Sequence, residues 1–421
     1  MRALPGPQVR WSLRLLIAAA AWAAATAGAA AALAAGCPEP APGRPTRSTP
    51  RPSPSLPLAV RVRGNHLVDA AGAVLQLRGV NVSGLEAVAA QGWNPADPWG
   101  GQSPDWQAIR RWQANAVRIP LNEASWLGYR CIDGDGKARN PDPGGNYRST
   151  VRRTVADATA AGLYVILDLH WSAPAHFCPL AQNPMADADH SIAFWISVAG
   201  EFKNRPNVLF ELFNEPFVGY GGPVGRGSWQ IIMDGGRLDR YVTGSAARYQ
   251  ADFPWQAAGM QQMLAAVRAQ GATNVVLIGA PSWAQDLSQW TATVPADALH
   301  QIAAAWHPYP NGNYGDPKAA EPKLGAVAYT WAQQILNAGY PIVISETGDH
   351  NAPGTVGSPL LARLLPWADA RHVSYLGWTW NSWANADNIL IRDRAGDPTD
   401  GYGAFFKQHL ACVAAALGTA G

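Results

Sequence analysis

From residue 58 onward, short apolar runs alternate with longer segments of helical periodicity. Such runs, separated by helix-length segments, are typical of strands in a parallel sheet that helices cover. Eight strand–helix units follow one another, and this number predicts an α/β protein with a (β/α)8 TIM barrel. The predicted strands are residues 74–81, 116–121, 163–170, 208–214, 275–279, 302–307, 341–346 and 373–380.

The intervening segments predict the helices of the barrel. A doubly wound sheet could also hold eight strands, but it usually carries a glycine-rich phosphate loop after its first strand. Neither G-x-G-x-x-G nor G-x-x-x-x-G-K-[ST] occurs, and residues 58–69 have the pattern of a small hairpin at the closed bottom of a barrel. We therefore expect one domain over residues 58–421, with helices at residues 104–113, 147–161, 191–202, 254–270, 322–337, 358–370 and about 403–417.

The amino-terminal segment has a different pattern. Residues 1–14 carry three Arg and no acid, and residues 15–36 form an uncharged, mostly Ala run that ends at Cys37. We expect residues 1–36 to be a secretory signal, cleaved near residues 30–35 or before a lipidated Cys37; retention as a membrane anchor is the third alternative. Residues 37–57 contain eight Pro in 21 positions and predict an extended linker.

Composition narrows the class of protein. Hydrophobic residues make up 48% of the 421 positions and charged residues 15%, so the chain can bury a large core. Without the three Arg of residues 1–14, 29 basic residues face 30 acidic ones, a net charge of −1. This balance argues against nucleic acid as a partner. We expect a secreted or cell-envelope-attached monomer that meets the membrane only through a lipid anchor at Cys37.

The four cysteines are sparse. Cys131 and Cys178 both lie in loops that follow predicted strands, so they could pair in an exported protein. Cys412 lies in an apolar carboxyl-terminal helix, where we expect a buried thiol. No C-x-x-C spacing occurs, and we predict no metal site.

Candidate chemistry lies at the ends of the predicted strands, where the active site of such a barrel is found. The fourth strand ends at Glu215 and the seventh at Glu346. A carboxylate at the end of an apolar strand costs free energy unless it is paired or has a function. Two carboxylates that face one pocket are what cleavage of a glycosidic bond requires. Indole faces can stack on sugar rings, and 19 Trp are present. The other candidates are Arg118, His170, Trp171, Asn214, His307, Tyr309 and Trp378.

Together these residues resemble glycoside hydrolase family 5, the cellulase family within a large clan of retaining barrel glycosidases. The resemblance covers roughly residues 58–410. Its most specific part is Asn214-Glu215-Pro216 together with Glu346. Supporting matches are residues 77–81 (LRGVN), 118–120 (RIP), His170, His307 with Tyr309, and residues 377–381 (GWTWN).

The resemblance implies a role for each residue. Glu215 would be the acid/base and Glu346 the nucleophile of a double displacement, with Glu215 protonated and Glu346 ionised. Tyr309 would bond Glu346, and Arg118 would help to keep it ionised. The remaining roles are binding ones, and no metal or organic cofactor is required. Asn214 would bond the sugar 2-hydroxyl, His170 and His307 would line the same subsite, and Trp378 would form its floor.

The expected substrate is a β-linked polysaccharide or oligosaccharide, cellulose-like β-1,4-glucan first and mannan, xyloglucan or β-1,3-glucan as alternatives. Thr347 stands where the family commonly has an aromatic residue, and residues 218–244 form a long Gly-rich insertion beside Glu215. The alternative of a different class is a non-catalytic, sugar-binding lipoprotein of the cell envelope. We expect about half of the loop tryptophans to contact ligand: Trp93, Trp99, Trp126, Trp171 and Trp283.

Overall fold

The computed structural model describes residues 57–87, 99, 103–218, 226–243, 248–250, 253–312, 317–350, 358–383 and 388–418. Its centre is a closed barrel of parallel strands that follow one another in chain order. The (β/α)8 architecture predicted from the sequence is therefore confirmed. The barrel strands are β4 (Arg78–Asn81), β5 (Ala116–Asn122), β8 (Tyr164–Trp171), β9 (Val208–Glu211), β14 (Val276–Ile278), β15 (Ile302–Ala305), β16 (Ile342–Thr347) and β17 (Ser374–Gly377).

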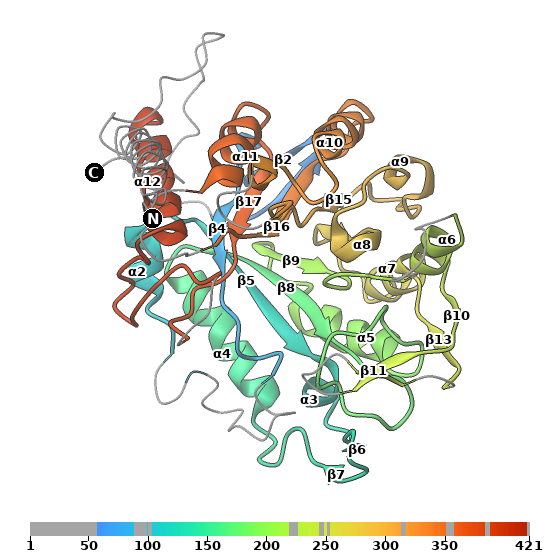
Figure 1. Ribbon diagram of the computed structural model, residues 1–421. Coiled ribbons are helices and arrows are strands. Elements are labelled where there is room, and N and C mark those ends of the chain that lie inside the picture. The colour runs from blue at the N-terminus through green and yellow to red at the C-terminus, as the bar shows by residue number, and fades with distance from the viewer. Residues whose placement is uncertain are drawn as a thin grey trace, which may run out of the picture.

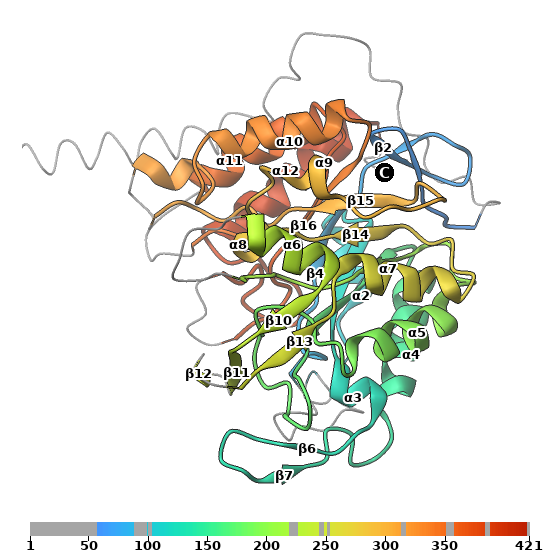
Figure 2. The same ribbon diagram turned by 90° about the vertical axis from the view of Figure 1, so that its right-hand side faces the viewer.

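Helices surround the barrel in both views (Figures 1 and 2). Ordinary helical periodicity gave most of their positions within one or two residues. Helices that correspond to the predicted ones are α2 (Trp106–Arg111), α4 (Tyr147–Ala160), α5 (Ser191–Phe202), α7 (Met260–Ala269), α10 (Val327–Asn337), α11 (Pro359–Asp369) and α12 (Tyr402–Ala416). Further helical segments are α3 (Glu123–Leu127), α6 (Arg226–Asp234), α8 (Pro281–Ala284), α9 (Trp290–Thr293) and a 3-10 turn at Pro317–Ala320.

The first predicted strand, residues 74–81, is divided. Its beginning forms β3 (Val74–Leu75) and pairs with β2 (His66–Val68), which pairs in turn with β1 (Arg61–Arg63). This small antiparallel sheet lies at the amino-terminal side of the barrel. Val60, just before β1, donates its backbone N–H to Pro206 O, shortly before β9 (2.9 Å). Apolar residues of the sheet pack against inward-facing barrel residues, and this cluster closes the bottom.

The predicted helix at residues 254–270 begins too early. Residues Trp255–Ala257 form β13, which pairs with β10 (Gly236–Leu238), and α7 starts only after Gly259. An added Cβ at Gly259 would lie 2.3 Å from the backbone carbon of Asp234, so only glycine fits this crossing. The described residues of the Gly-rich insertion form α6, β10 and β11 (Tyr241–Thr243), and β11 pairs with β12 (Arg248–Gln250), which follows the insertion.

Cys131 and Cys178 form a disulfide. It ties the hairpin of β6 (Cys131–Ile132) and β7 (Ala138–Arg139) to the loop after β8. Cys412 is also disulfide-bonded, so the expectation of a buried thiol is wrong. The sequence could not separate the two states, because an apolar helical position suits either form of sulphur.

Residues 1–36, Cys37 and nearly all of the 37–57 linker lie outside the described residues. The signal, the lipid anchor and the spacer therefore stay predictions. In the described part of the chain, no helix combines the length and the apolar character needed to cross a bilayer.

Candidate active site

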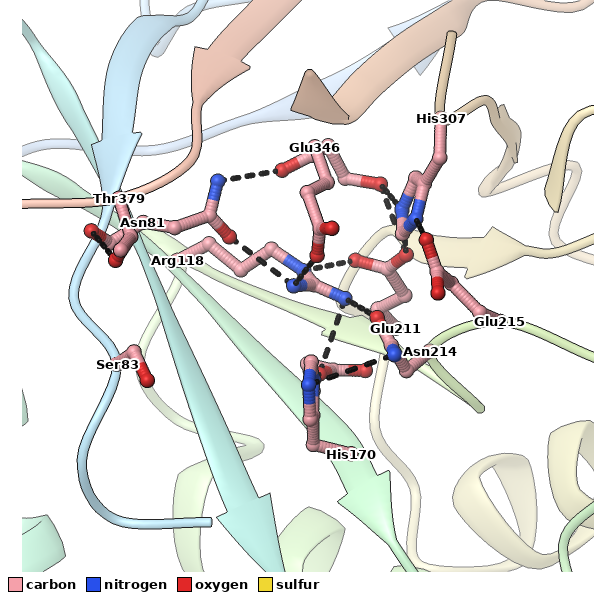
Figure 3. Close-up of polar contacts among 12 residues, drawn as sticks. Asn81, Ser83, Arg118, His170, Glu211, Asn214, Glu215, His307, Glu346 and Thr379 are labelled. Atoms are coloured by element: carbon pink, nitrogen blue, oxygen red, sulfur yellow. Dashed lines mark hydrogen bonds and ion pairs between the residues drawn. The ribbon is translucent and has the colours of Figure 1, made fainter. Parts of the chain in front are cut away.

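The carboxyl ends of the barrel strands bring the two candidate glutamates together. Glu215 follows β9 and Glu346 lies in β16. One carboxylate oxygen of Glu215, one of Glu346 and a ring nitrogen of His307 all lie within 4.8 Å of one another. Figure 3 shows Glu346 beside the guanidinium of Arg118, and Glu215 on the far side of His307.

Strand alternation explains which side chains face this centre. In β8, Val165, Leu167 and Leu169 pack outward in the main hydrophobic core, whereas Ile166 packs into the bottom cluster. Successive residues of a strand point to opposite faces, so Asp168 and His170 stand above Ile166 inside the barrel. The interior thus changes from apolar at the bottom to ionisable at the carboxyl end.

A register shift gives β16 two consecutive inward side chains. The pairing of β16 with β17 shifts between Ile344 and Thr347, as at a β-bulge. A bulge re-aims the side chains beside it, and here both Ser345 and Glu346 contact groups of the centre.

Arg118 is the hub of the site. It is fully buried, and its planar fork of donors can serve several acceptors at once. The prediction that it contacts Glu346 agrees with the geometry, but it also pairs with two carboxylates that the sequence analysis did not assign. The bonds run from Nε to Glu211 Oε2 (2.7 Å), from Nη1 to Asn81 Oδ1 (3.0 Å) and Glu346 Oε2 (3.1 Å), and from Nη2 to Asn214 Oδ1 (2.7 Å) and Asp168 Oδ2 (3.0 Å).

Exposure separates the four central carboxyl groups. The side chains of Asp168 and Glu211 are 0% exposed, whereas that of Glu346 is 8% and that of Glu215 is 13% exposed. A group must be reachable to touch a substrate. Glu215 and Glu346 can therefore take part in chemistry, and Asp168 and Glu211 can act only through their neighbours.

Glu346 is held at both oxygens. The Tyr309 hydroxyl donates to Oε1 (2.7 Å), and Arg118 donates to Oε2. Burial, followed by the charges of Glu346 and Glu215, raises the pKa of Tyr309 well above its ordinary value, so Tyr309 stays a donor.

Glu215 contacts His307. Its Oε1 lies 3.0 Å from His307 Nδ1. The other ring nitrogen, Nε2, lies 3.2 Å from Glu211 Oε1 and 3.0 Å from Ser345 Oγ. Burial lowers the pKa of His307, but the charge of Glu346 and the hydrogen bonds of Glu211 and Glu215 raise it to about 10.

The pKa shifts of the two glutamates run against the expected protonation states. Burial raises the pKa of Glu215, but the hydrogen bond and charge of His307 outweigh it, so the pKa is lowered. Burial and the charge of Glu215 raise the pKa of Glu346, despite the opposing charges of His307 and Arg118. In the free site Glu215 is therefore the more readily ionised group, because an imidazolium stands beside it.

His170, Asn214 and Trp378 form one side of the centre. His170 Nδ1 lies 2.7 Å from Asp168 Oδ2, and Nε2 lies 3.5 Å from Asn214 Nδ2. Because Arg118 occupies Asn214 Oδ1, the amide nitrogen is the end of Asn214 left for a ligand hydroxyl. The partly exposed Trp378 lies parallel to the His170 ring, at 5.5 Å and 3°.

The other candidate tryptophans differ in their burial and contacts. Trp126 is buried against Phe194, so its candidacy as a sugar platform is wrong; it lies on the inner face of α3. Trp283 stacks on Phe217, two residues after Glu215 (5.4 Å, 10°). Trp171 is partly buried one position beyond His170, where the pairing of β8 with β5 shifts register. Trp99 donates to Ser83 O, and Trp93 lies outside the described residues.

Asp168, Glu211, Ser345 and Asn81 were not among the candidates, although all four bond to the central groups. A signal was present for the two acids. Each is a charged residue in an otherwise apolar strand. Burial of such a charge costs free energy, and the same argument singled out Glu215 and Glu346. Ser345 and Asn81 carry no charge and gave no such signal.

Two groups of described residues bring acids and a His close enough to share a cation: Glu215 with His307 and Glu346, and Glu123 with Asp187 and His190. In the first, the Arg118 guanidinium already supplies the positive charge. In the second, Glu123 accepts hydrogen bonds at both oxygens, from Tyr129, Ala173 N and Ser191. We assign no metal to either group.

Comparisons with known proteins show the family of the chain. The model of the family cellulase (glycosyl hydrolase family 5) matches residues 68–383. Endoglucanase N of Pectobacterium atrosepticum is 24% identical over 344 residues, 78% of this chain and 59% of the relative. Endoglucanase Z of Dickeya dadantii is 26% identical over 246 residues, 58% of this chain and 42% of the relative. The chain spans about half the length of the curated relatives it matches.

Solved structures share the fold. The β-glucanase SdGluc5_26A of Saccharophagus degradans, in complex with cellotetraose, has a TM-score of 0.55 and 21% identity, covering 87% of this chain and 98% of its own. The catalytic domain of Thermobifida fusca endoglucanase Cel5A has a TM-score of 0.53 and 17% identity, covering 84% and 97%.

Proposed function

The chain belongs to glycosyl hydrolase family 5, the cellulase family, and from that premise we propose that it hydrolyses β-linked glucan chains with retention of configuration. Glu346 is the nucleophile and Glu215 the acid/base. The observation that carries this proposal is the approach of their carboxylate oxygens to within 4.8 Å. Retaining enzymes hold the two carboxyl groups about 5–5.5 Å apart, whereas inverting enzymes separate them by about 6.5–9.5 Å to admit a water.

The reaction proceeds in two displacements. Glu346 attacks the anomeric carbon while Glu215 gives a proton to the departing glycosidic oxygen, and a glycosyl-enzyme forms. Glu215 then takes a proton from a water molecule, whose oxygen attacks the same carbon and releases Glu346.

The neighbouring residues position the sugar. The amide nitrogen of Asn214 lies 3.5 Å from His170 Nε2, and its second N–H donates to the 2-hydroxyl beside the reacting carbon. Trp378 offers an indole face as the floor of this subsite, because the axial C–H groups of a pyranose form an apolar patch that suits an aromatic ring. Tyr309 and Arg118 orient Glu346 for attack.

Release of reducing ends tests the activity. We expect wild-type protein to act on carboxymethyl cellulose first, in a panel with mannan, xyloglucan and β-1,3-glucan. Glu215→Gln and Glu346→Gln should each lose at least about a thousandfold in kcat, within the range that removal of such a group causes. Glu201→Gln is the matched control, since Glu201 pairs with Arg152 on the outer surface.

Two outcomes would count against the proposal. If NMR shows that the first product formed is the α-anomer, retention is wrong. If wild-type protein binds a glucan but cleaves nothing in the panel, the sugar-binding alternative holds instead. The two central carboxylates favour the enzyme, because a binding platform needs only the aromatic faces.

Substrate choice rests on a few hydroxyl contacts in the loops, and β-1,4-glucan stays the first choice. We also propose export through residues 1–36, with residues 37–57 as a spacer before the domain at 58–421, and with Cys37 as the anchor point when its thiol is lipidated. Mass spectrometry of the mature amino terminus tests the anchor, and light scattering tests the expected monomer.

A further inference from the structure

Four side chains form a continuous path from the closed interior of the barrel to Glu215. Glu211 accepts from Ser345 Oγ (2.8 Å), and both lie against His307 Nε2. His307 Nδ1 then reaches Glu215 Oε1 (3.0 Å). Glu211, Ser345 and His307 are fully buried, and only Glu215 has exposed atoms. Figure 3 shows His307 between the two glutamates.

The proton on one side of the ring is fixed by these contacts. Ser345 has one hydroxyl proton and directs it to Glu211. The hydroxyl oxygen therefore meets His307 as an acceptor, and the second neighbour of Nε2, the Glu211 carboxylate, is an acceptor too. An unprotonated Nε2 would face two acceptors at hydrogen-bond distance, so Nε2 carries a proton.

The other side of the ring holds a single shared proton. Nδ1 and Glu215 Oε1, 3.0 Å apart, need one proton between them. Either a neutral ring accepts from the Glu215 carboxylic acid, or an imidazolium donates to the Glu215 carboxylate. Both forms hold the same number of protons, so the pair titrates as a unit.

We propose that Glu211 is a positioning residue which, through His307, retains the shared proton on the His307–Glu215 pair and so sets the alkaline limit of activity. This inference rests on the proposed hydrolysis and on Glu215 as its acid. Glu211 itself touches no substrate, because it is completely buried.

The charges around the path support this role. Glu211, Glu215 and Glu346 face the His307 ring as anions. On the side away from the ring, Arg118 pairs with Glu211, and Asp168, with its partner His170, lies beside Arg118. Tyr309 faces Glu346 and Glu215. Burial raises the pKa of Glu211, but Arg118 and His307 outweigh it and lower the pKa to about 2. Glu211 therefore keeps its negative charge throughout the working pH range.

A proton transfer within the pair also resolves the reversed pKa values of the glutamates. When the Nδ1 proton moves to Glu215 Oε1, the imidazolium becomes neutral imidazole and the carboxylate becomes a carboxylic acid. Glu346 then no longer faces an anion at Glu215, which favours its ionised form. Glu215 passes this proton to the glycosidic oxygen as the C–O bond breaks, and in the second displacement it regains one from water.

NMR of ¹⁵N-histidine protein reports on the path in the wild type. His307, assigned through His307→Asn, should keep Nε2 protonated at every pH of the titration. In Glu211→Gln the ring pKa of His307 should fall by at least about one unit, because a stabilising anion is gone. A wild-type ring that lacks the Nε2 proton at neutral pH overturns the proposal, even if Glu211→Gln fails to fold.

The pH profile of kcat/KM gives the functional readout. The alkaline limb of Glu211→Gln should move at least about one unit down, with a melting temperature that shows a folded protein. Glu211→Asp, which keeps the charge, is the matched control and should stay within about half a unit of the wild type. Equal shifts in both variants, or none in Glu211→Gln, overturn the proposal. Absence of wild-type turnover refutes the proposed function instead. The titration of the His307 ring then still tests whether Glu211 retains the shared proton.

Discussion

Replacing Tyr309 by Phe removes one hydroxyl from the candidate nucleophile. That hydroxyl donates to Glu346 Oε1 at 2.7 Å, while Arg118 serves Oε2 at 3.1 Å. The ring of Tyr309 stays, so the packing around it is little changed. The variant therefore tests whether Arg118 alone can orient and ionise Glu346.

The expected size follows from the type of bond. A hydrogen bond to a charged group contributes about 1.5–3 kcal/mol, and each 1.36 kcal/mol is tenfold in rate. We expect kcat/KM to fall about 10- to 150-fold. KM should change little, because the lost contact is to Glu346 rather than to the glucan.

The pH profile should change in a defined direction. A donor that bonds the ionised carboxylate favours it and lowers its pKa. Loss of the Tyr309 hydroxyl therefore raises the pKa of Glu346 further above its ordinary value, in the direction that burial and Glu215 already impose. Activity needs ionised Glu346, so the acid limb of kcat/KM should move up by about one unit or more.

Tyr375→Phe is the matched control. Tyr375 is a buried tyrosine whose hydroxyl also donates to a carboxylate, Asp369 Oδ1, at 3.2 Å. Asp369 lies at the end of α11, outside the central group. Steady-state hydrolysis of carboxymethyl cellulose between about pH 4 and 9 should show the control at wild-type rates. If Tyr309→Phe stays within threefold of wild type with an unmoved acid limb, the assigned role of Tyr309 is wrong.

Two further changes probe binding and stability. Trp378→Ala removes the indole that lies against His170. A loss of about 1–2 kcal/mol of stacking free energy should raise KM about five- to thirtyfold. An unchanged KM for short oligosaccharides would place the sugar elsewhere. The double change Cys131→Ser and Cys178→Ser removes a disulfide across a sequence separation of 47. The loop-entropy model predicts that the free energy of unfolding falls by about 4 kcal/mol. A fall below about 1 kcal/mol in urea unfolding would contradict this prediction.

The barrel could be predicted because its strands are mostly apolar and recur at regular spacing. The prediction was weakest where tertiary contacts decide the local structure. Residues 74–81 read as one strand, yet Val74–Leu75 pair with a separate small sheet. Residues 255–257 read as the start of a helix, yet they pair with β10, because Gly259 allows the chain to cross within contact of Asp234.

The strand-end rule located the exposed carboxyl groups but not the buried ones behind them. Glu215 and Glu346 stand at the ends of the predicted strands 208–214 and 341–346, so position alone singled them out. Asp168 and Glu211 lie inside the predicted strands 163–170 and 208–214, at positions whose inward direction follows from alternation once one inward residue is known. His170 was a candidate, so Asp168, two residues earlier, could have been placed beneath it.

The protonation states could not be read from the sequence, because they depend on charges that several strands contribute to one small volume. The sequence supplies Glu215 and Glu346, and two carboxyl groups alone would only divide one proton between themselves. The fold adds Arg118 from β5 and His307 after β15, and behind them Glu211 from β9. His307 then shares one proton with Glu215, and in our proposal Glu211 retains that proton on the pair. A buried residue without access to substrate thus controls whether the exposed acid can act, and this is why Glu211→Gln should alter the pH range of the reaction rather than its fold.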